Sequence, residues 1–177
     1  MVVAENVSGA GNQQERLSIE SIPIPIGNFL SGFALGEASF MIVCRPRKDY
    51  KRGWKLSAAF NVSQHDLEPL RLFQHTLKCG SFRKAGNDGW YYEVNRLVDL
   101  NTKVVPFFER FPLVGVKQQD FVCFREAVKI LSQYAISDTN YLAVLSWREQ
   151  MNRGGKRKYS KERILRDYMP NPSQPTE

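Results

Sequence analysis

The chain has 177 residues, of which 42% are hydrophobic and 12% aromatic, and its formal net charge is +7. This length and apolar content allow one domain with a sizeable core and exclude a wholly disordered chain. No apolar run approaches the length of a membrane span and residues 1–14 do not resemble a secretory signal, so we expect a soluble, intracellular protein with no membrane partner. The excess of Lys and Arg favours a polyanionic partner.

The first predicted elements are a polar arm and a short helix. Residues 1–21 are expected to form a flexible arm, whose end is kept extended by Pro23 and Pro25. Asn28 is expected to cap a helix that runs to Glu37.

This helix combines two small residues with a terminal acid. Gly32 and Gly36 are four positions apart, so they share a helix face that a second backbone can approach closely. Glu37 ends the helix, where the helix dipole disfavours a carboxylate, so its placement indicates function more than stability. The pattern predicts a metal site presented to a polyanion, although an ordinary buried glycine-rich helix would also carry it.

A long hairpin follows, with strands over residues 39–47 and 54–63. Apolar residues alternate with small, polar or basic ones in the second strand, which gives one apolar face and one face suited to lie on nucleic acid. The apolar set is Leu56, Ala58, Phe60 and Val62, and the other set is Lys55, Ser57, Ala59, Asn61 and Ser63.

The remaining pattern alternates a helix, a second hairpin and further helices, which predicts an α+β domain with an antiparallel sheet. Asp99 is expected to cap a helix that runs to Phe111, and Pro106 to kink this helix or delay its start. The predicted elements are a helix over 66–78, strands over 81–84 and 90–96, and helices over 118–133, 140–151 and 160–168.

Basic residues form two clusters that suit contact with phosphates, and solvated loops of a basic protein are the alternative. One cluster holds Arg45, Arg47, Lys48, Lys51, Arg52 and Lys55 against Asp49. The other holds Arg153, Lys156, Arg157, Lys158, Lys161, Arg163 and Arg166 against Glu162. Three cysteines without Cys-x-x-Cys spacing predict reduced thiols.

Residues 30–38, Leu-Ser-Gly-Phe-Ala-Leu-Gly-Glu-Ala, resemble the LAGLIDADG motif, although Leu35 and Ala38 depart from its common acid and glycine. The resemblance extends over about residues 28–135 in element order. It implies the LAGLIDADG endonuclease fold, an α+β domain of order αββαββα with a saddle-shaped antiparallel sheet over DNA and extra C-terminal helices. One motif in the chain implies a homodimer.

The implied organisation has four regions. Residues 1–21 are the flexible arm, and residues 22–135 are the DNA-binding and catalytic core. Residues 136–169 form a C-terminal helical extension, and residues 170–177 a loose tail.

The resemblance also implies a catalytic set. Glu37 and the backbone carbonyl of Ala38 would bind Mg²⁺, Gln64 would orient water, and Lys117 would act on the phosphate or the solvent network. A strand end would equally explain Gln64, and a solvated side chain would explain Lys117. Glu68 stands where the family often has a basic residue.

Partner contacts complete the implied site. The interface between two copies would use Leu30, Gly32, Phe33 and Gly36. DNA bases would be contacted by Arg45, Arg47, Tyr50, Lys55, Ser57 and Asn61, the flanks by Arg83 and Lys84, and phosphates by Lys51 and Arg52.

We therefore predict a site-specific homing endonuclease that hydrolyses double-stranded DNA at a long pseudo-palindromic site and leaves short 3′ overhangs. It would work in the bacterial cytoplasm, a chloroplast or a mitochondrion. Two alternatives stay open: an RNA maturase that binds intron RNA and assists splicing, and a DNA-binding regulator that does not cut. Glu37, Gln64 and Lys117 together favour the nuclease.

Overall fold

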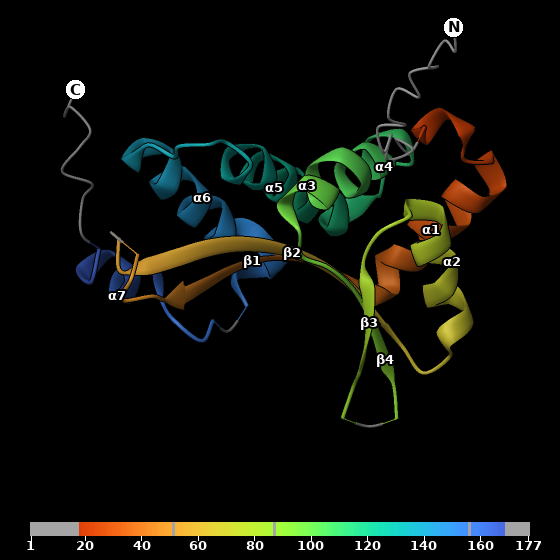
Figure 1. Ribbon diagram of the computed structural model, residues 1–177, viewed down its shortest axis with the longest axis horizontal. Coiled ribbons are helices and arrows are strands. Elements are labelled where there is room, and N and C mark those ends of the chain that lie inside the picture. The colour runs from red at the N-terminus through yellow and green to blue at the C-terminus, as the bar shows by residue number, and fades with distance from the viewer. Residues whose placement is uncertain (1–17, 51, 87, 156, 169–177) are drawn as a thin grey trace, which may run out of the picture.

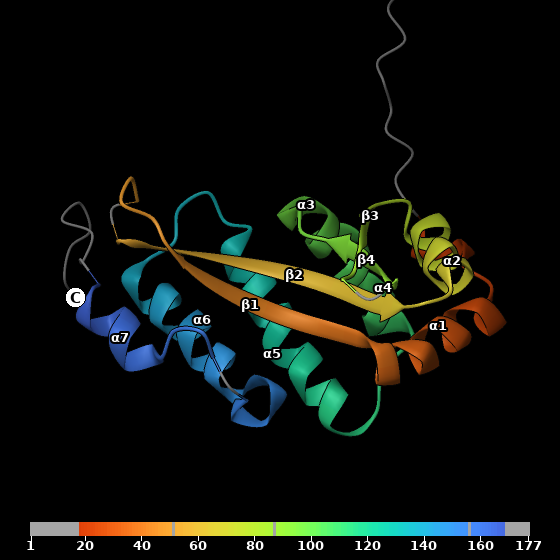
Figure 2. The same cartoon turned by 90° about the horizontal axis from the view of Figure 1, so that it is seen from below.

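The computed structural model describes residues 18–50, 52–86, 88–155 and 157–168. A four-stranded antiparallel sheet carries helices on one face, and its other face is uncovered (Figures 1 and 2). The strand order β1-β2-β4-β3 joins two hairpins through β2 and β4. The predicted α+β class is confirmed. Among the described residues, no helix has the length and apolar composition that crossing a bilayer requires.

The described elements follow one another in chain order from Ile19 to Arg166. They are η1 (Ile19–Ser21), α1 (Ile24–Glu37), β1 (Ala38–Pro46), β2 (Trp54–Gln64), α2 (Leu67–Leu77), β3 (Ser81–Lys84), β4 (Trp90–Val94), α3 (Leu97–Asp99), η2 (Leu100–Val104), α4 (Val105–Arg110), α5 (Gly115–Leu131), α6 (Asp138–Gln150), η3 (Met151–Gly154) and α7 (Lys161–Arg166).

Helix α1 begins at Ile24, earlier than the sequence indicated. Pro25 lies in its first turn, where the missing N–H of a proline costs no intrahelical hydrogen bond. Asn28 therefore lies inside the helix, and its predicted capping role is wrong. The end of the predicted arm is ordered, because Ile19 is buried against the core. Residues 1–17 lie outside the described part.

Strands β1 and β2 form the long hairpin, in a register that pairs Phe40 with Phe60 and Arg45 with Lys55. Even-numbered side chains are buried from Ala38 to Cys44 and from Trp54 to Val62, and the intervening odd-numbered ones are at least partly exposed. Successive side chains of a strand point to opposite faces, so the alternation in the sequence identified both faces correctly.

Phenylalanine rings join the sheet to the helices above it. The Phe40 ring lies with its centroid 5.1 to 5.5 Å from those of Phe60, Phe108, Phe121 and Phe124. All five side chains are at most 1% exposed. Burying a side chain of this size contributes about 1.5–3 kcal/mol, so this cluster fixes β1 and β2 beneath α4 and α5.

The stretch over residues 97–110 is helical throughout, with the π-helical turn η2 between α3 and α4. Asp99 lies inside it and Arg96 is the N-cap residue, so the predicted capping role of Asp99 is wrong. Its carboxylate instead pairs with Lys103 at 3.0 Å. The wider π turn directly precedes Pro106, which lacks the N–H that an α-helix would use there.

The C-terminal helices pack back onto the sheet. Helix α6 lies against α5 and β1, and α7 lies beside the far end of the β1–β2 hairpin in both views (Figures 1 and 2). Ser137 and Ser160 cap α6 and α7, their hydroxyls accepting hydrogen bonds from the N–H groups of Asn140 and Arg163. The predicted tail over residues 170–177 lies outside the described residues.

Candidate active site and nucleic-acid interface

The carboxylate of Glu37 lies where α1 passes directly into β1. Glu37 is the last residue of the helix and Ala38 is the first of the strand. The N–H of Ala38 still donates to the carbonyl of Ala34, while its side chain is buried in the core. Glu37 itself is exposed. A rigid junction therefore presents an acid to solvent.

Lys117 reaches the same junction from the first turn of α5. Its Nζ donates a hydrogen bond of 2.6 Å to the carbonyl oxygen of Ala38. A bond from a charged donor is short and strong, so it holds the ammonium group beside the residue that follows Glu37. Glu37, Ala38 and Lys117, predicted to act together, are brought together by the fold.

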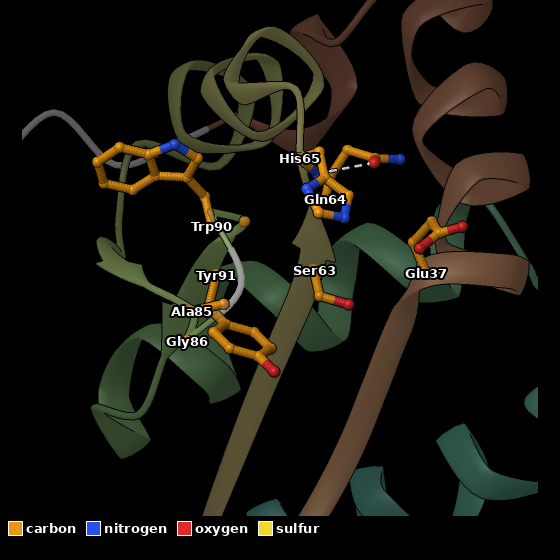
Figure 3. Close-up of a pocket in the computed structure, with 9 residues that line it drawn as sticks. Glu37, Ser63, Gln64, His65, Ala85, Gly86, Trp90 and Tyr91 are labelled. Atoms are coloured by element: carbon orange, nitrogen blue, oxygen red, sulfur yellow. Dashed lines mark hydrogen bonds between the residues drawn. The ribbon is translucent and has the colours of Figure 1, made fainter.

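Gln64 faces Glu37 across an open pocket of about 370 Å³ (Figure 3). The Oε1 of Gln64 accepts a hydrogen bond from the backbone N–H of His65 at 2.8 Å, and its amide nitrogen is directed toward the Glu37 side. Ser63 and His65 also line this pocket, although the sequence suggested no catalytic role for either. Their position next to Gln64 in the sequence could have indicated that they lie at the same pocket.

The oxygen donors at this pocket suit a hard divalent cation. Glu37 offers a carboxylate there, and the adjacent Ala38 offers a carbonyl that has a second lone pair beyond its bond from Lys117, whereas the Gln64 oxygen already accepts from the His65 N–H. Among the described residues, no three His, Cys, Asp or Glu side chains gather as metal ligands. Glu37 is the one carboxylate among the described residues that line this pocket.

The outer face of α1 is apolar and open. Gly32 and Gly36 are exposed, and a Cβ placed on either would meet nothing within 4 Å. Phe29 is 51% exposed beside Phe33, which packs partly buried against Phe73. Phe29 was not predicted to take part in an interface, although its spacing from Gly32 and Gly36 would have placed it on the same face.

Leu30 points the other way and is fully buried within this chain. On the same side, the Ser31 hydroxyl donates a 2.9 Å hydrogen bond to the carbonyl of Phe111. Residues 30 and 32 are about 200° apart on an α-helix, so they cannot share a face. The assignment of Leu30 to a contact between copies is corrected: it is a core residue.

The uncovered face of the sheet is basic and polar. Arg45 and Lys55 form an exposed register pair, and Ser57 and Asn61 follow on the same face of β2. Asn61 lies between Ser39 of β1 and Glu93 of β4. The side chains predicted to meet DNA bases from these strands therefore share one accessible surface.

The hairpin end carries an intramolecular pair. The Nε of Arg47 donates to Oδ1 of Asp49 at 2.7 Å, and this bond holds the pKa of Asp49 down to about 2. Tyr50 is exposed nearby. Lys51 lies outside the described residues.

Arg52 is buried, with 7% of its surface exposed. Its Nε donates to Oδ1 of Asp138 at 3.0 Å, and its Nη2 donates to the carbonyl of Ile136 at 2.5 Å. A buried guanidinium needs such partners, and here the C-terminal helices supply them. The predicted contact of Arg52 with phosphate is wrong.

Arg83 and Lys84 lie on opposite faces of the β3–β4 hairpin, because they are adjacent in a strand. Arg83 lies 4.6 Å over the Tyr91 ring on the uncovered face, and Lys84 lies 5.3 Å over the Trp90 ring on the other. Only Arg83 is placed to meet a ligand on the uncovered face. Arg83 also pairs with Glu93 at 2.8 Å.

The C-terminal basic cluster is partly internal. Nη2 of Arg157 donates to the carbonyls of Arg148 and Met151, and burial together with Arg148 lowers the pKa of Arg157. Arg148 is itself buried and was not singled out in the sequence. The exposed members, such as Arg153 and Arg163, remain available to phosphates.

A profile of the family described as LAGLIDADG endonuclease matches residues 30–128, more than half of the chain. This chain belongs to the LAGLIDADG endonuclease family. The matched span begins inside α1 and ends inside α5. It therefore includes the Glu37 junction, both hairpins and Lys117.

Curated relatives of this LAGLIDADG chain are longer proteins. The "probable intron-encoded endonuclease 3" of Neurospora crassa is 38% identical over 109 residues, covering 59% of this chain and 20% of that protein. The chain spans about a fifth to a quarter of the length of such relatives.

Solved LAGLIDADG structures share the fold. The homing endonuclease I-TnaI superposes with a TM-score of 0.69 at 26% identity, covering 80% of this chain and 94% of that chain. I-SmaMI, bound to an uncleaved DNA target in the presence of calcium ions, superposes with a TM-score of 0.70 at 25% identity, covering 82% of this chain and 49% of that chain. The fold implied by the motif is confirmed.

Proposed function

We propose that this LAGLIDADG protein is a homodimeric homing endonuclease that cleaves double-stranded DNA at one long, nearly palindromic site. Hydrolysis is metal-dependent and leaves short 3′ overhangs. The observation that carries the proposal is the exposed Glu37, set between the open glycine face of α1 and the basic face of the sheet. The DNA-bound state of I-SmaMI supports it.

The dimer supplies the second half of the site. Gly32 and Gly36 let the α1 helices of two copies approach closely, and Phe29 adds apolar area to the contact. Because Glu37 ends α1, this pairing brings two carboxylates together near the two-fold axis.

Magnesium suits these donors, with Glu37 and the Ala38 carbonyl holding it, and when bound it supplies positive charge at the phosphate and acidifies water. The protein's own groups position the reactants. Gln64 orients water through its amide, and the Lys117 ammonium stabilises negative charge on the phosphate.

The uncovered face of the sheet would lie in the major groove. Arg45 and Lys55 suit guanine edges, Asn61 suits adenine, and Arg83 meets the flank of the site. The intron-encoded relative supports an intron as the coding context. The target would then be the genome of a bacterium, a chloroplast or a mitochondrion.

The deciding experiment offers a randomised duplex library to the purified protein with Mg²⁺ or with EDTA, and sequences the cut ends. We expect Glu37→Gln to bind the selected duplex as well as the native protein does and to cut at least about 100-fold more slowly. Glu109→Gln, which removes a charge on α4, is the matched control. Cutting by Glu37→Gln at the native rate would refute the metal assignment, and a monomer on DNA would refute the dimer.

A further inference from the structure

The far end of the β1–β2 hairpin contacts the C-terminal helices through Arg52 and Trp54, which are both buried. Figure 2 shows α7 beside this end, with α6 running alongside β1. Arg52 at the hairpin end is among the few charged side chains in the described residues that are buried, with 7% exposed. A side chain with this charge is rarely buried without a specific set of partners.

Those partners come from the start of α6. Arg52 donates to Asp138 Oδ1 at 3.0 Å and to the Ile136 carbonyl, and its guanidinium lies 5.3 Å from the centre of the Tyr141 ring. The rigid fork of arginine matches a carboxylate and a carbonyl at once, which a solvated lysine would not do.

The end of α7 closes the same cluster. The Tyr168 hydroxyl donates to Asp138 Oδ1 at 2.5 Å, and its ring packs against Tyr141 with centroids 5.2 Å apart. Gly53 follows Arg52 with a left-handed φ of +68°, and a Cβ there would come within 3.3 Å of the Asp167 carbonyl. Only glycine meets both demands without strain.

The same cluster reaches the first residue of β2. The Tyr141 hydroxyl donates to the Trp54 carbonyl at 3.0 Å, and the Trp54 ring packs edge-on against Tyr159 at 4.9 Å. Trp54 is directly followed by Lys55, which points to the uncovered face opposite Arg45. A displacement of Trp54 is therefore passed to Lys55 and Arg45.

We propose that Arg52, Asp138, Tyr141 and Tyr168, the hairpin clamp, are positioning residues that set the far half of the β1–β2 hairpin for recognition of the outer base pairs of the DNA site. This inference rests on the proposed function. The clamp touches no base. It acts through Arg45 and Lys55, whereas Asn61 and Glu37 at the other end of the hairpin are held by the main core.

The test uses the full chain with two conservative variants. Tyr168→Phe removes one hydroxyl, and Asp138→Asn removes one charge from the clamp. Tyr134→Phe is the control for the first, because Tyr134 is fully exposed. Glu68→Gln is the control for the second, because Glu68 pairs with Arg71 on the exposed surface of α2.

The first measurement is amide hydrogen exchange without DNA. We expect faster exchange at residues 43–45 and 54–57 in both clamp variants, with residues 39–41 and 59–62 unchanged. The controls should match the native protein. Unchanged exchange at the far half in both variants, or an equal increase along the whole hairpin, would overturn the clamp.

The second measurement compares cleavage of the selected duplex with cleavage of its single-base variants. We expect discrimination at the outer base pairs to fall about tenfold in the clamp variants, with that near the cut unchanged. An equal fall at all positions would overturn the positioning role. If the native protein binds no duplex, the proposed function fails and the recognition role fails with it, while hydrogen exchange still reports whether the clamp holds the hairpin.

Discussion

The two hairpins of the sheet differ in what supports them. The strands of the β1–β2 hairpin have 9 and 11 residues. The far end of this hairpin is fixed by helices from the C-terminal part of the chain. The β3–β4 hairpin has strands of 4 and 5 residues, and its end extends away from the helices (Figure 1). A two-stranded ribbon is marginally stable by itself, so a long one needs support from outside the sheet.

The basic side chains of the two hairpins differ in the same way in what they contact. Arg83 and Lys84 of the short hairpin lie over rings of the neighbouring strand, in contacts exposed to water. Arg52 of the long hairpin is buried in an ion pair with Asp138. We therefore expect the long hairpin to hold its shape on binding and the short one to adjust.

The largest contrast should come from the rings that anchor the two hairpins. Phe60→Ala in β2 removes a fully buried ring, and we expect a loss of about 3–5 kcal/mol in the free energy of unfolding. Phe82→Ala in β3 removes a ring that is only partly buried, so about 1–2 kcal/mol is expected. Urea unfolding of both variants measures the difference. Equal losses would mean that the short hairpin is anchored as firmly as the long one.

A smaller contrast lies in the hairpin ends. Gly53→Ala places a Cβ on a left-handed residue against the Asp167 carbonyl, so we expect a loss of about 1–2 kcal/mol. Gly86→Ala in the short hairpin meets open space and should change stability by less than about 0.5 kcal/mol. Thermal unfolding followed by circular dichroism compares them. If Gly53→Ala left the thermal stability unchanged, the segment around Asp167 would be shown to move aside at little cost.

A further effect appears only at alkaline pH. Burial raises the pKa of the Cys44 thiol in β1 to about 11, above that of an unfolded thiol. The unfolded chain therefore releases this proton first, so the contribution of Cys44 is complete below about pH 8.5 and is lost as the pH rises toward 11. Cys44→Ala should reduce the loss of stability over this window in urea unfolding. An unchanged pH dependence would show that Cys44 does not contribute to it.

Local patterns in the sequence predicted the parts of the fold that local interactions determine. The strands of both hairpins follow from alternation. The helix predicted over residues 66–78 is α2, with Asp66 as its N-cap residue rather than inside it. Glu37 was predicted from the motif, and Lys117 from the wider resemblance to the family. The helical period would also have placed Leu30 and Gly32 on different faces of the motif helix. The alternation of a strand would have placed Arg83 and Lys84 on opposite faces of β3.

One error concerns long-range packing. Arg52 belongs to a basic run at a hairpin end, and nothing nearby in the sequence shows that Asp138 will bury it. The Asp99 error is local: Arg96 is the N-cap residue, the helix begins at Leu97, and Asp99 lies inside it just before the π turn.

Arg52 and its partner Asp138 are separated by 86 positions along the chain. During synthesis the long hairpin leaves the ribosome well before α6 and α7 exist, and its edge strand β1 carries Phe40, Ile42 and Cys44 toward a core that is not yet built. Contacts this distant form slowly, and unpaired edge strands invite other chains. We expect the nascent protein to depend on chaperones until residue 168 has left the ribosome. The ability to bind a DNA site would then be acquired last in folding.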